Sequence, residues 1–549
     1  MFPFKKAPGG YGRWKNQKEK LVSANDSAQS EDTNRRADWH AITDQQDVAD
    51  VCLIVEGCYP FVRGGVSSWL DWLIRSQPEL SFSVVAIFPD AASRDCHYDV
   101  PQNLISFQQI GLIDAGGECD FGSDMKAKSA LLAEKLHGLF DAGDLTDFSE
   151  IDALINDPHL NLPTKGLMNS PFVWHVICRL YELKMPQASF IDFYWGARSL
   201  LGGMFQIMRS KIPEARLYHT ISTGYAGLLA AKAKTLTGKP TVISEHGIYT
   251  NERRIEILMA DWIADTVNKG YSIEDDRYDL RDLWLRAFEA HARICYEACD
   301  EITTLFRGNQ SLQRQFGAQE GRLQVIANGI ALETFNKLPR KGGGVPAFAM
   351  VGRVVPIKDI KTFLQAAALV KQRIGNIAVY IMGPTDEDPS YFKECEKLVE
   401  ELGLSDCLTF TGNVKLVDYF PKIDLIVLSS LSEAQPLVLL EAGAAGIPCV
   451  ATDVGSCREI IEGDQEEIPS FGPGGIVTAL VDAEAQANAI CKILQDAPVR
   501  NAMSDAARKR INSFYKSQQS ADKYAALYAA HGIGAQRSTP HLHLMDKEA

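Results

Sequence analysis

The sequence predicts an α/β fold with two doubly wound domains that face each other across a cleft. Short apolar runs alternate with helix-forming stretches from 48 to 337, and the same alternation starts again at 347. Residues 338–346, which include Gly342-Gly343-Gly344, lie between the two series and predict a linker. A chain of 549 residues is also too long for one hydrophobic core, so at least two domains are expected.

The first domain is predicted to begin with a strand at 50–57, a glycine-containing turn, a helix at 66–75 and a strand at 82–88. In a doubly wound domain the first turn lies at the carboxyl edge of the sheet, where ligands bind. The dinucleotide fingerprint Gly-x-Gly-x-x-Gly is absent. The pair Gly64-Gly65 therefore predicts a close approach of backbone N–H groups to some ligand, and a tight turn without a ligand explains it equally well.

The stretch from about 104 to 214 departs from this alternation. Acidic loops such as Asp144-Leu145-Thr146-Asp147 separate three predicted helices. Those helices are expected at 126–141, 171–184 and 190–209. We therefore expect a helical insertion on the frame of the first domain.

Two histidines lie at the ends of the next two predicted strands. His219 ends the strand at 215–219, and His246 follows the strand at 240–244, in a loop that continues to Arg254. The ends of parallel strands meet at one edge of a sheet, so both histidines would face the same crevice. A single histidine at a strand end is more often structural.

The second domain is predicted at 347–513, with a helix within 514–531 that crosses back onto the first domain. Its strands are expected at 347–351, 377–382, 408–410, 425–428, 449–451 and 475–477. The arm at 1–47 and the tail at 532–549 are predicted to be disordered, because both are polar and terminal.

The composition is that of a globular protein outside the membrane. Apolar residues make up 46% and charged residues 23%, and no apolar run is long enough to cross a bilayer. The 12 cysteines are scattered through apolar contexts, as is typical of reduced thiols, so we expect a cytoplasmic protein. A formal net charge of −14 argues against a nucleic-acid partner, although a local basic site for a small anion is compatible with it.

Two carboxylates flank a strand-to-helix connection in the second domain. An apolar strand precedes Glu433, and the run from Pro436 to Ala445 predicts a helix that ends at Gly446 and carries Glu441 on an apolar stretch. A helix N-terminus favours an anion or a hydroxyl-rich ligand. Glu441 lies either on the solvated face of the helix or in an apolar environment, where its charge would require a polar or cationic partner.

Two cations follow the first strand of the second domain. Arg353 and Lys358 lie in a loop that leads into a helix. Arginine offers a planar fork and lysine a point charge, so the pair suits a diphosphate, although a basic surface loop explains either residue alone. Cations for a diphosphate and carboxylates for hydroxyls together predict a nucleotide-sugar site.

A metal site is not expected. Asp386-Glu387-Asp388 has the Asp-x-Asp spacing of some metal-binding carboxylates, but it lies in a proline-bounded turn of the second domain. Arg353 and Lys358 already supply the positive charge that a metal would bring. We therefore expect no metal and no cofactor besides the donor substrate.

Several segments resemble a known family. Gly-Arg-Val-Val-Pro-Ile-Lys-Asp at 352–359 and Ser-Glu-Ala-Gln-Pro-Leu-Val-Leu-Leu-Glu-Ala at 432–442 resemble the paired signatures of retaining glycosyltransferases of family four, which have the GT-B fold. The segments 56–69, 244–254 and 383–389 resemble, more narrowly, the cytosolic glycosyltransferases of Pel exopolysaccharide synthesis. The resemblance covers nearly all of 50–530.

The resemblance implies roles for individual residues. Arg353 and Lys358 would bind the diphosphate of a UDP-sugar, Glu441 the ribose hydroxyls, and Glu433 the transferred sugar. His246 would lie near that sugar and Gly65 near phosphate and acceptor, while His219 matches a less certain position. The residues expected to bind the donor are Gly64, Gly65, Arg353, Lys358, Glu433, Ala434, Gln435, Pro436, Leu437 and Glu441, and those expected to act in catalysis are His246, Glu433, Arg353 and Lys358.

Gln435 and Pro436 depart from the glycine-rich or phenylalanine-containing start that is usual in the family. Contacts at Ala434 and Gln435 are therefore expected to influence donor choice. The implied reaction transfers a hexose or N-acetylhexosamine, with retention, to a growing polysaccharide. Inner-membrane exopolysaccharide synthase subunits are the implied partners, through which the protein would reach the membrane.

Two other functions remain open on the same frame. One is a nucleotide-sugar epimerase or phosphorylase, because fold does not determine function. The other is a nucleotide-sugar-binding subunit that docks on a membrane synthase, with the insertion at 104–214 as its contact surface.

Overall fold

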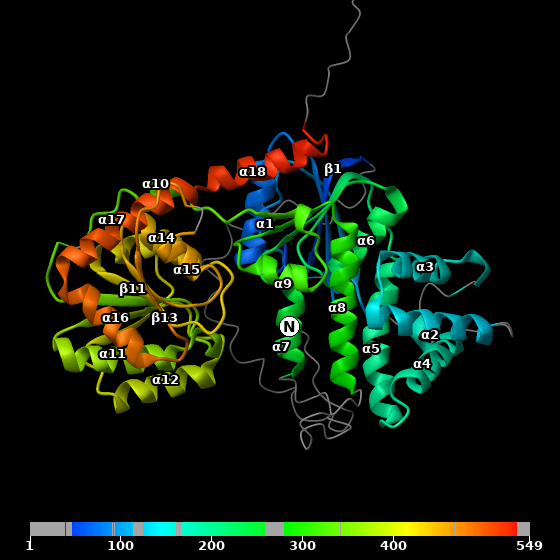
Figure 1. Cartoon of the computed structure of the whole chain (residues 1–549), viewed down its shortest axis with the longest axis horizontal. Coiled ribbons are helices and arrows are strands. Elements are labelled where there is room, and N and C mark those ends of the chain that lie inside the picture. The colour runs from blue at the N-terminus through cyan, green and yellow to red at the C-terminus, as the bar shows by residue number, and fades with distance from the viewer. Residues whose placement is uncertain are drawn as a thin grey trace, which may run out of the picture.

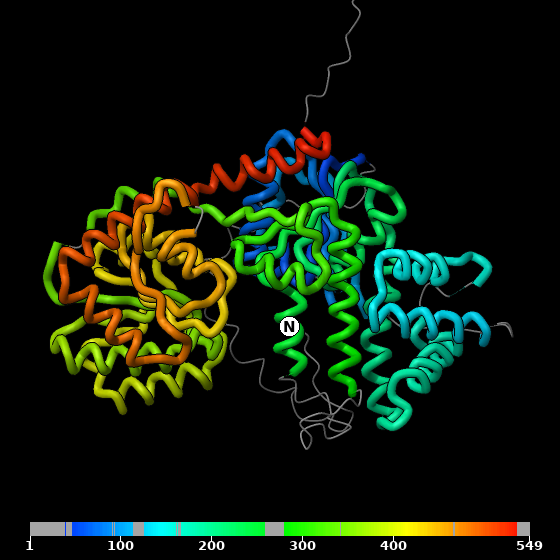
Figure 2. The backbone as a smooth tube through the Cα atoms, in the orientation of Figure 1, coloured from blue at the N-terminus to red at the C-terminus, as the bar shows by residue number. Residues whose placement is uncertain are grey.

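The computed structural model describes residues 39, 47–90, 92, 94–113, 125–160, 162, 166–258, 279–340, 342–464 and 467–534. The described chain forms two α/β domains side by side, each built on a parallel sheet (Figures 1 and 2). The expected fold class of two doubly wound domains is confirmed. Most of the arm and of the tail that were expected to be disordered lie outside the described residues.

The N-terminal domain contains a seven-stranded sheet in the order β3-β2-β1-β4-β5-β6-β7. Its strands are β1 (Ala49–Glu56), β2 (Phe82–Phe88), β3 (Leu104–Gly111), β4 (Ala215–Thr220), β5 (Thr241–Glu245), β6 (Glu301–Thr304) and β7 (Leu323–Val325). Its helices are α1 (Gly65–Ser76), α2 (Met125–Ala142), α3 (Leu145–Ile155), α4 (Pro171–Lys184), α5 (Phe190–Arg209), α6 (Tyr225–Thr237), α7 (Tyr249–Leu258), α8 (Leu280–Ala298) and α9 (Asn309–Gln315).

The C-terminal domain contains a six-stranded sheet in the order β10-β9-β8-β11-β12-β13. Its strands are β8 (Ala347–Val351), β9 (Ala378–Met382), β10 (Leu408–Gly412), β11 (Leu425–Leu428), β12 (Cys449–Thr452) and β13 (Gly475–Thr478). Its helices are α11 (Ile360–Ile374), α12 (Pro389–Glu401), α13 (Leu416–Tyr419), α14 (Leu437–Ala445), α15 (Cys457–Glu462), α16 (Ala483–Gln495) and α17 (Ala497–Phe514). The short helix α10 (Leu332–Phe335) precedes the linker but packs its apolar side chains with those of α14.

Both faces of β1 are buried, as is typical of a central parallel strand. Cys52 and Ile54 belong to the core shared with α5 and α6, whereas Val51, Leu53 and Val55 belong to the core shared with α1. Side chains of a strand alternate between faces, so one strand supports both layers.

The last helix, α18 (Ser517–Ala530), crosses from the C-terminal domain to the N-terminal one and lies beside α1 (Figure 1). Its Tyr524 and Tyr528 are fully buried in the same core as α1. Ile330 forms two backbone hydrogen bonds at the start of α18. Its N–H donates to the Tyr515 carbonyl over 2.9 Å, and its carbonyl accepts from the Ser517 N–H over 3.0 Å. The two connections between the domains are thus hydrogen-bonded to each other.

Three elements differ from the sequence-based expectations. Residues 104–111 form the edge strand β3 rather than the start of the insertion, and polar residues such as Gln108 and Gln109 obscured its strand signal. The acidic segment at 144–147 is a capping box that begins α3, in which Asp144 accepts from the backbone N–H of Asp147 over 3.0 Å. Part of the loop expected after His246 is the helix α7.

Trp39 also differs, because it falls within the arm that was expected to be disordered. Its side chain is buried, donates through Nε1 to the Tyr98 carbonyl over 3.0 Å and packs against Tyr59 and Phe107. Trp39 is therefore part of the hydrophobic core of the N-terminal domain.

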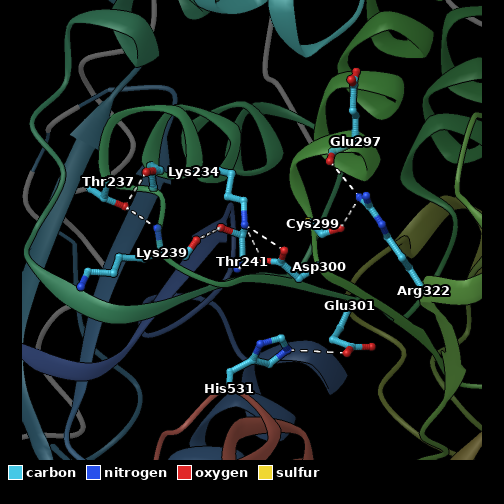
Figure 3. A network of polar contacts seen from close by, with 11 residues as sticks. Lys234, Thr237, Lys239, Thr241, Glu297, Cys299, Asp300, Glu301, Arg322 and His531 are labelled. Carbon is cyan, nitrogen blue, oxygen red and sulfur yellow. Dashed lines mark hydrogen bonds and ion pairs between the residues drawn. The ribbon is translucent and has the colours of Figure 1, made fainter.

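A polar network lies at the amino ends of β5 and β6 (Figure 3). Lys234 contacts Asp300 at 2.7 Å, Asp300 accepts from the Thr241 N–H at 2.8 Å, and His531 after α18 lies 3.6 Å from Glu301. Ligands of doubly wound sheets bind at the opposite, carboxyl edge. We therefore infer that this network is structural and not part of a ligand site. It joins α6 to the sheet and contacts the end of α18.

Candidate active site

The connection from β11 to α14 carries the acidic motif. The helix begins after Pro436, which is its N-cap, and ends at Gly446, whose φ of 73° is left-handed. This arrangement agrees with the helix predicted from 436 to 445, because proline suits the start of a helix and glycine its end. Leu437 at the first helical position is exposed.

Glu433 and Lys358 form an ion pair across 75 positions of sequence. Lys358 Nζ lies 2.5 Å from Glu433 Oε1, and Ser430 Oγ donates to the same oxygen over 2.6 Å. The side chains of Lys358 and Glu433 are 18% and 13% exposed. The ion pair is therefore largely shielded from water, which strengthens its hydrogen bonds. Ser430 supports the position of the Glu433 carboxylate, and no motif in the sequence indicated this role.

The loop that carries Lys358 is fastened to the end of β11. Ser429 Oγ donates to the carbonyls of Lys358 and Asp359 over 3.0 and 2.9 Å. Asp359 also caps α11 by accepting from the Thr362 N–H over 3.3 Å. The two motifs are therefore held together by backbone contacts as well as by the ion pair.

Arg353 lies on the same loop but is far more exposed. Its Nη1 lies 2.5 Å from Glu387 Oε1, and the two side chains are 52% and 43% exposed. Asp388, next in sequence, instead caps α12 by accepting from the Tyr391 N–H over 3.0 Å. The acidic turn at 386–388 thus supplies a partner for Arg353 and a helix cap.

Glu441 lies inside α14 and is partly buried. Burial raises the pKa of its carboxyl to about 7, and no neighbouring charge or hydrogen bond contributes to that shift. Within the described residues its carboxylate makes no hydrogen bond or ion pair. The partner that the sequence led us to expect is thus not a side chain of the described chain, and the carboxylate is available to a ligand.

The backbone of Glu433 and Ala434 lies directly against Gly455. A side chain at Gly455 would place Cβ 2.2 Å from the Glu433 carbonyl oxygen and 2.4 Å from that of Ala434, and φ at this glycine is +53°. The Ser456 N–H donates to the Ala434 carbonyl over 2.9 Å. Gly455 therefore fixes the acidic loop, and no motif in the sequence indicated this.

The side chain of Gln435 contacts the backbone that precedes the linker. Its Oε1 accepts from the Asn328 N–H over 2.7 Å, its Nε2 lies 3.4 Å from the Asn328 carbonyl, and its side chain is buried. Both ends of the amide are engaged with backbone that precedes the linker. The side chain thus joins the acidic loop to the N-terminal domain, and an influence of Gln435 on donor choice stays a prediction.

The domains also meet at α15 and α9. Arg307 Nε lies 3.4 Å from Asp464 Oδ2, and the carboxyl group of Glu459 in α15 lies near the backbone of Arg307 and Gly308. Together with the contact between Gln435 and Asn328, these interactions set how the acidic loop lies relative to the N-terminal domain.

Gly64 and Gly65 lie at the N-terminus of α1, which has no side-chain cap. A Cβ added at either glycine would meet nothing within 4 Å, and φ at Gly64 is 173°, which any residue adopts. The fold itself therefore does not require glycine here. An anionic ligand binds favourably in open space beside a helix N-terminus.

His246 follows β5 and packs edge-on against Trp69 of α1, with ring centroids 4.4 Å apart. Burial lowers the pKa of His246 to about 4, so the ring is neutral near pH 7. Its Nε2 is buried and has no hydrogen-bond partner among the described residues. A neutral imidazole with a free nitrogen can accept from, or donate to, a sugar hydroxyl.

His219 is structural instead. Its Nδ1 and Nε2 lie 2.8 Å from Tyr528 Oη and from Ser244 Oγ, respectively, and the ring is fully buried. Burial lowers its pKa to about 3. Both nitrogens are engaged, so His219 joins α18 to the sheet rather than facing the crevice that we expected it to share with His246.

Glu245, next to His246, was not singled out from the sequence. Its Oε2 accepts from Tyr296 Oη over 2.5 Å and from Gln313 Nε2 over 2.9 Å. Burial raises its pKa to about 7. Its contacts join β5 to α8 and α9, so it supports the strand end that carries His246.

Among the described residues, no three His, Cys, Asp or Glu side chains are grouped so that they could hold a metal ion. No helix within the described ranges is long and apolar enough to cross a membrane.

Solved structures identify the fold. The sucrose-phosphate synthase of Thermosynechococcus elongatus superposes with a TM-score of 0.53 at 17% identity, over 87% of this chain and 98% of that one. Alr3699/HepE of Anabaena in complex with UDP superposes with a TM-score of 0.51 at 14% identity, over 87% and 99%. With its two Rossmann-like domains, the chain has the GT-B fold.

The family comparison is consistent with this fold. Residues 333–510 match the family described as "Glycosyl transferases group 1", and residues 49–321 match a "Domain of unknown function (DUF3492)". The C-terminal domain is thus similar to the group 1 glycosyltransferases. That domain carries Arg353, Lys358, Glu433 and Glu441.

Curated relatives share part of the chain. The D-inositol 3-phosphate glycosyltransferase of Mycolicibacterium smegmatis is 30% identical over 276 residues, 47% of this chain and 59% of that protein. The N-acetyl-alpha-D-glucosaminyl L-malate synthase of Bacillus anthracis is 26% identical over 234 residues, 42% of this chain and 52% of that protein. The chain spans about half the length of the curated relatives it matches.

Proposed function

We propose that this protein is a retaining glycosyltransferase that transfers a hexose or N-acetylhexosamine from a UDP-sugar to a growing polysaccharide without a metal ion. One observation carries the proposal: the loop after β8 carries two cations, and one of them, Lys358, lies with its Nζ 2.5 Å from Glu433 Oε1 in the acidic strand-to-helix connection. Cations suit a diphosphate and carboxylates suit sugar hydroxyls. The complex of HepE with UDP, on the same fold, supports a uridine nucleotide as the donor's carrier.

Each side chain has a part in this reaction. Arg353 and Lys358 neutralise the charge that develops on the departing nucleoside diphosphate. Glu441 accepts from the ribose hydroxyls. Glu433 holds Lys358 in place and keeps its other oxygen for a hydroxyl of the transferred sugar.

The acceptor hydroxyl attacks C1 on the face from which the diphosphate leaves. The bond from C1 to the diphosphate oxygen breaks, the new glycosidic bond forms, and the acceptor proton passes to the leaving diphosphate. No enzyme nucleophile or general base is needed in this scheme. Neutral His246 orients the sugar through its free Nε2.

We further propose that the acceptor is an exopolysaccharide of the Pel type, because the segments at 56–69, 244–254 and 383–389 resemble PelF. The protein would then act in the cytoplasm with inner-membrane synthase subunits. The helices α2, α3 and α4, on the side of the N-terminal domain away from the C-terminal domain, are the proposed contact surface (Figure 1).

A thermal-shift panel tests the donor site. UDP, UDP-glucose, UDP-N-acetylglucosamine, UDP-N-acetylgalactosamine and GDP-mannose are added to the protein and to Lys358→Ala. UDP-linked ligands are expected to raise Tm, and the substitution is expected to abolish most of the rise. Lys361→Ala is the matched control, because Lys361 pairs with Glu394 at 2.7 Å on the outside of the same domain. Equal shifts in Lys358→Ala and the native protein would refute the site.

Product analysis tests the reaction. NMR of the product is expected to show the anomeric configuration of the donor, and EDTA is expected to leave transfer unchanged. Conversion of the UDP-sugar without an acceptor would instead indicate an epimerase. Loss of transfer in EDTA, with recovery in manganese, would contradict a metal-independent reaction.

A further inference from the structure

The two cations of the proposed diphosphate site have very different partners. Lys358 is paired with Glu433 in a shielded position, and Glu433 is held in addition by Ser430. Arg353 is paired with Glu387, and both side chains are about half exposed to solvent. Only the partner of Arg353 can therefore move into water without leaving a buried charge unpaired.

Backbone contacts between two loops position Glu387 beside Arg353. The Gly352 N–H donates to the Met382 carbonyl over 2.9 Å, and the Val354 N–H donates to the Pro384 carbonyl over 3.0 Å. A Cβ on Gly383 would lie 2.0 Å from the Gly352 carbonyl oxygen, so the two loops are in direct backbone contact. Glu387 therefore lies beside Arg353 because two neighbouring loops are tied together.

The other end of the Glu387 segment is fixed as well. Asp388 accepts from the N–H of Tyr391 over 3.0 Å and from Ser390 Oγ over 2.7 Å, and it begins α12. The backbone of Glu387 is thus anchored on both sides, while its side chain is 43% exposed to solvent. An anchored backbone and an exposed side chain suit a carboxylate that leaves the Arg353 guanidinium and returns to it.

We propose that Glu387 is an affinity- and selectivity-determining residue: its carboxylate occupies the Arg353 guanidinium until the diphosphate of a sugar nucleotide displaces it. The inference rests on the proposed function and adds to it a residue outside the two signature motifs. A diphosphate offers several charged oxygens and can satisfy the arginine fork from more than one direction. A singly charged anion competes less well with the tethered carboxylate, so Glu387 favours diphosphates over simple anions.

The same residue assists product departure. After transfer, the nucleoside diphosphate must leave Arg353, and the nearby carboxylate takes its place on the guanidinium. Removal of the carboxylate charge is therefore expected to strengthen nucleotide binding and to slow release of the nucleoside diphosphate.

Isothermal titration of UDP and UDP-glucose into the full-length protein and Glu387→Gln tests the proposal. We expect Glu387→Gln to bind UDP about two- to fivefold more tightly, in line with the strength of an exposed ion pair. The gain is expected to shrink at high salt, because exposed charges are screened. Glu394→Gln is the matched control: it removes the same charge from an exposed pair in the same domain and is expected to leave UDP affinity unchanged.

A double-substitution cycle with Arg353→Ala separates displacement from a general effect of charge. Glu387→Gln is expected to have no effect on UDP affinity once Arg353 is absent. Unchanged or weaker UDP binding in Glu387→Gln, an equal gain in Glu394→Gln, or a gain that persists in Arg353→Ala would each overturn the proposal. If the native protein binds neither UDP nor any UDP-sugar, the proposed function itself fails.

Discussion

Lys358 Nζ lies 2.5 Å from Glu433 Oε1, and this ion pair joins the two signature motifs of the C-terminal domain. Neither side chain is more than one-fifth exposed. A charge removed from such a pair leaves the other charge partly desolvated. The pair therefore links the proposed donor site to the stability of the domain.

The first prediction concerns this coupling. Lys358→Met is expected to lower the free energy of unfolding by about 1–3 kcal/mol, because Glu433 loses its cation. The double variant Lys358→Met/Glu433→Gln is expected to be less destabilised than the sum of the single variants. Urea unfolding of all four proteins measures the coupling energy. Additive effects would show that the pair contributes no interaction energy.

The second prediction is the pH dependence of stability in Glu441→Gln. The folded-state pKa of about 7 lies above the ordinary value of 4.5, so the charged carboxylate is unfavourable in the folded protein. The penalty is small near pH 4.5, grows as the pH rises, and is complete above pH 7. Glu441→Gln is therefore expected to raise the free energy of unfolding by about 1–3 kcal/mol near pH 8 and by much less near pH 4.5. A gain of equal size at both pH values would contradict the assigned cause.

The third prediction is the pH dependence of donor binding. Ribose hydroxyls donate better to a carboxylate than to a carboxylic acid, so UDP-glucose is expected to bind more weakly as the pH falls from about 8 to 6. UDP-glucose is used because its diphosphate lacks the terminal phosphate group that titrates near pH 6. Titration calorimetry is expected to show a flatter profile in Glu441→Gln. An unchanged profile would place the titrating group elsewhere, with Glu245 as the next residue to test.

The fourth prediction separates ligand approach from folding at Gly65. An added methyl group meets no atom of the protein within 4 Å, so Gly65→Ala is expected to keep or gain up to about 1 kcal/mol of stability. Sugar transfer is expected to fall at least about tenfold, because the methyl group would occupy the space that we propose for phosphate or acceptor at the helix N-terminus. Gly138→Ala, on the exposed side of α2, has equal space and serves as the control. Full activity in Gly65→Ala would remove this glycine from the site.

The fifth prediction tests the crossing helix. Tyr528→Phe removes the hydroxyl 2.8 Å from His219 Nδ1 and leaves a buried nitrogen without its partner. The expected loss is about 1–3 kcal/mol in the free energy of unfolding. Tyr419→Phe, which removes a hydroxyl from a half-buried ring of the C-terminal domain, is expected to have little effect. Equal stability of Tyr528→Phe and the native protein would show that the contact between Tyr528 and His219 contributes nothing to holding α18.

Local patterns determined most of the fold. The strand at 82–88 and the helices at 171–184 and 225–237 have the bounds predicted from periodicity and from turn residues. Such patterns are sufficient because a buried strand or an amphipathic helix shows its environment in a few consecutive residues. The edge strand β3 was missed, since an edge strand with polar side chains lacks that pattern.

The sequence by itself determined which residue types gather at the carboxyl ends of β4, β8 and β11. Only the tertiary structure decided their partners: Arg353 with Glu387, Gln435 with Asn328, and His219 with Tyr528, which lies 309 positions later. The physical reason is that hydrogen bonds and ion pairs depend on distances of about 3 Å between atoms far apart along the chain. Those distances are set by how the sheets, the loops and the crossing helix pack, and no local pattern encodes them.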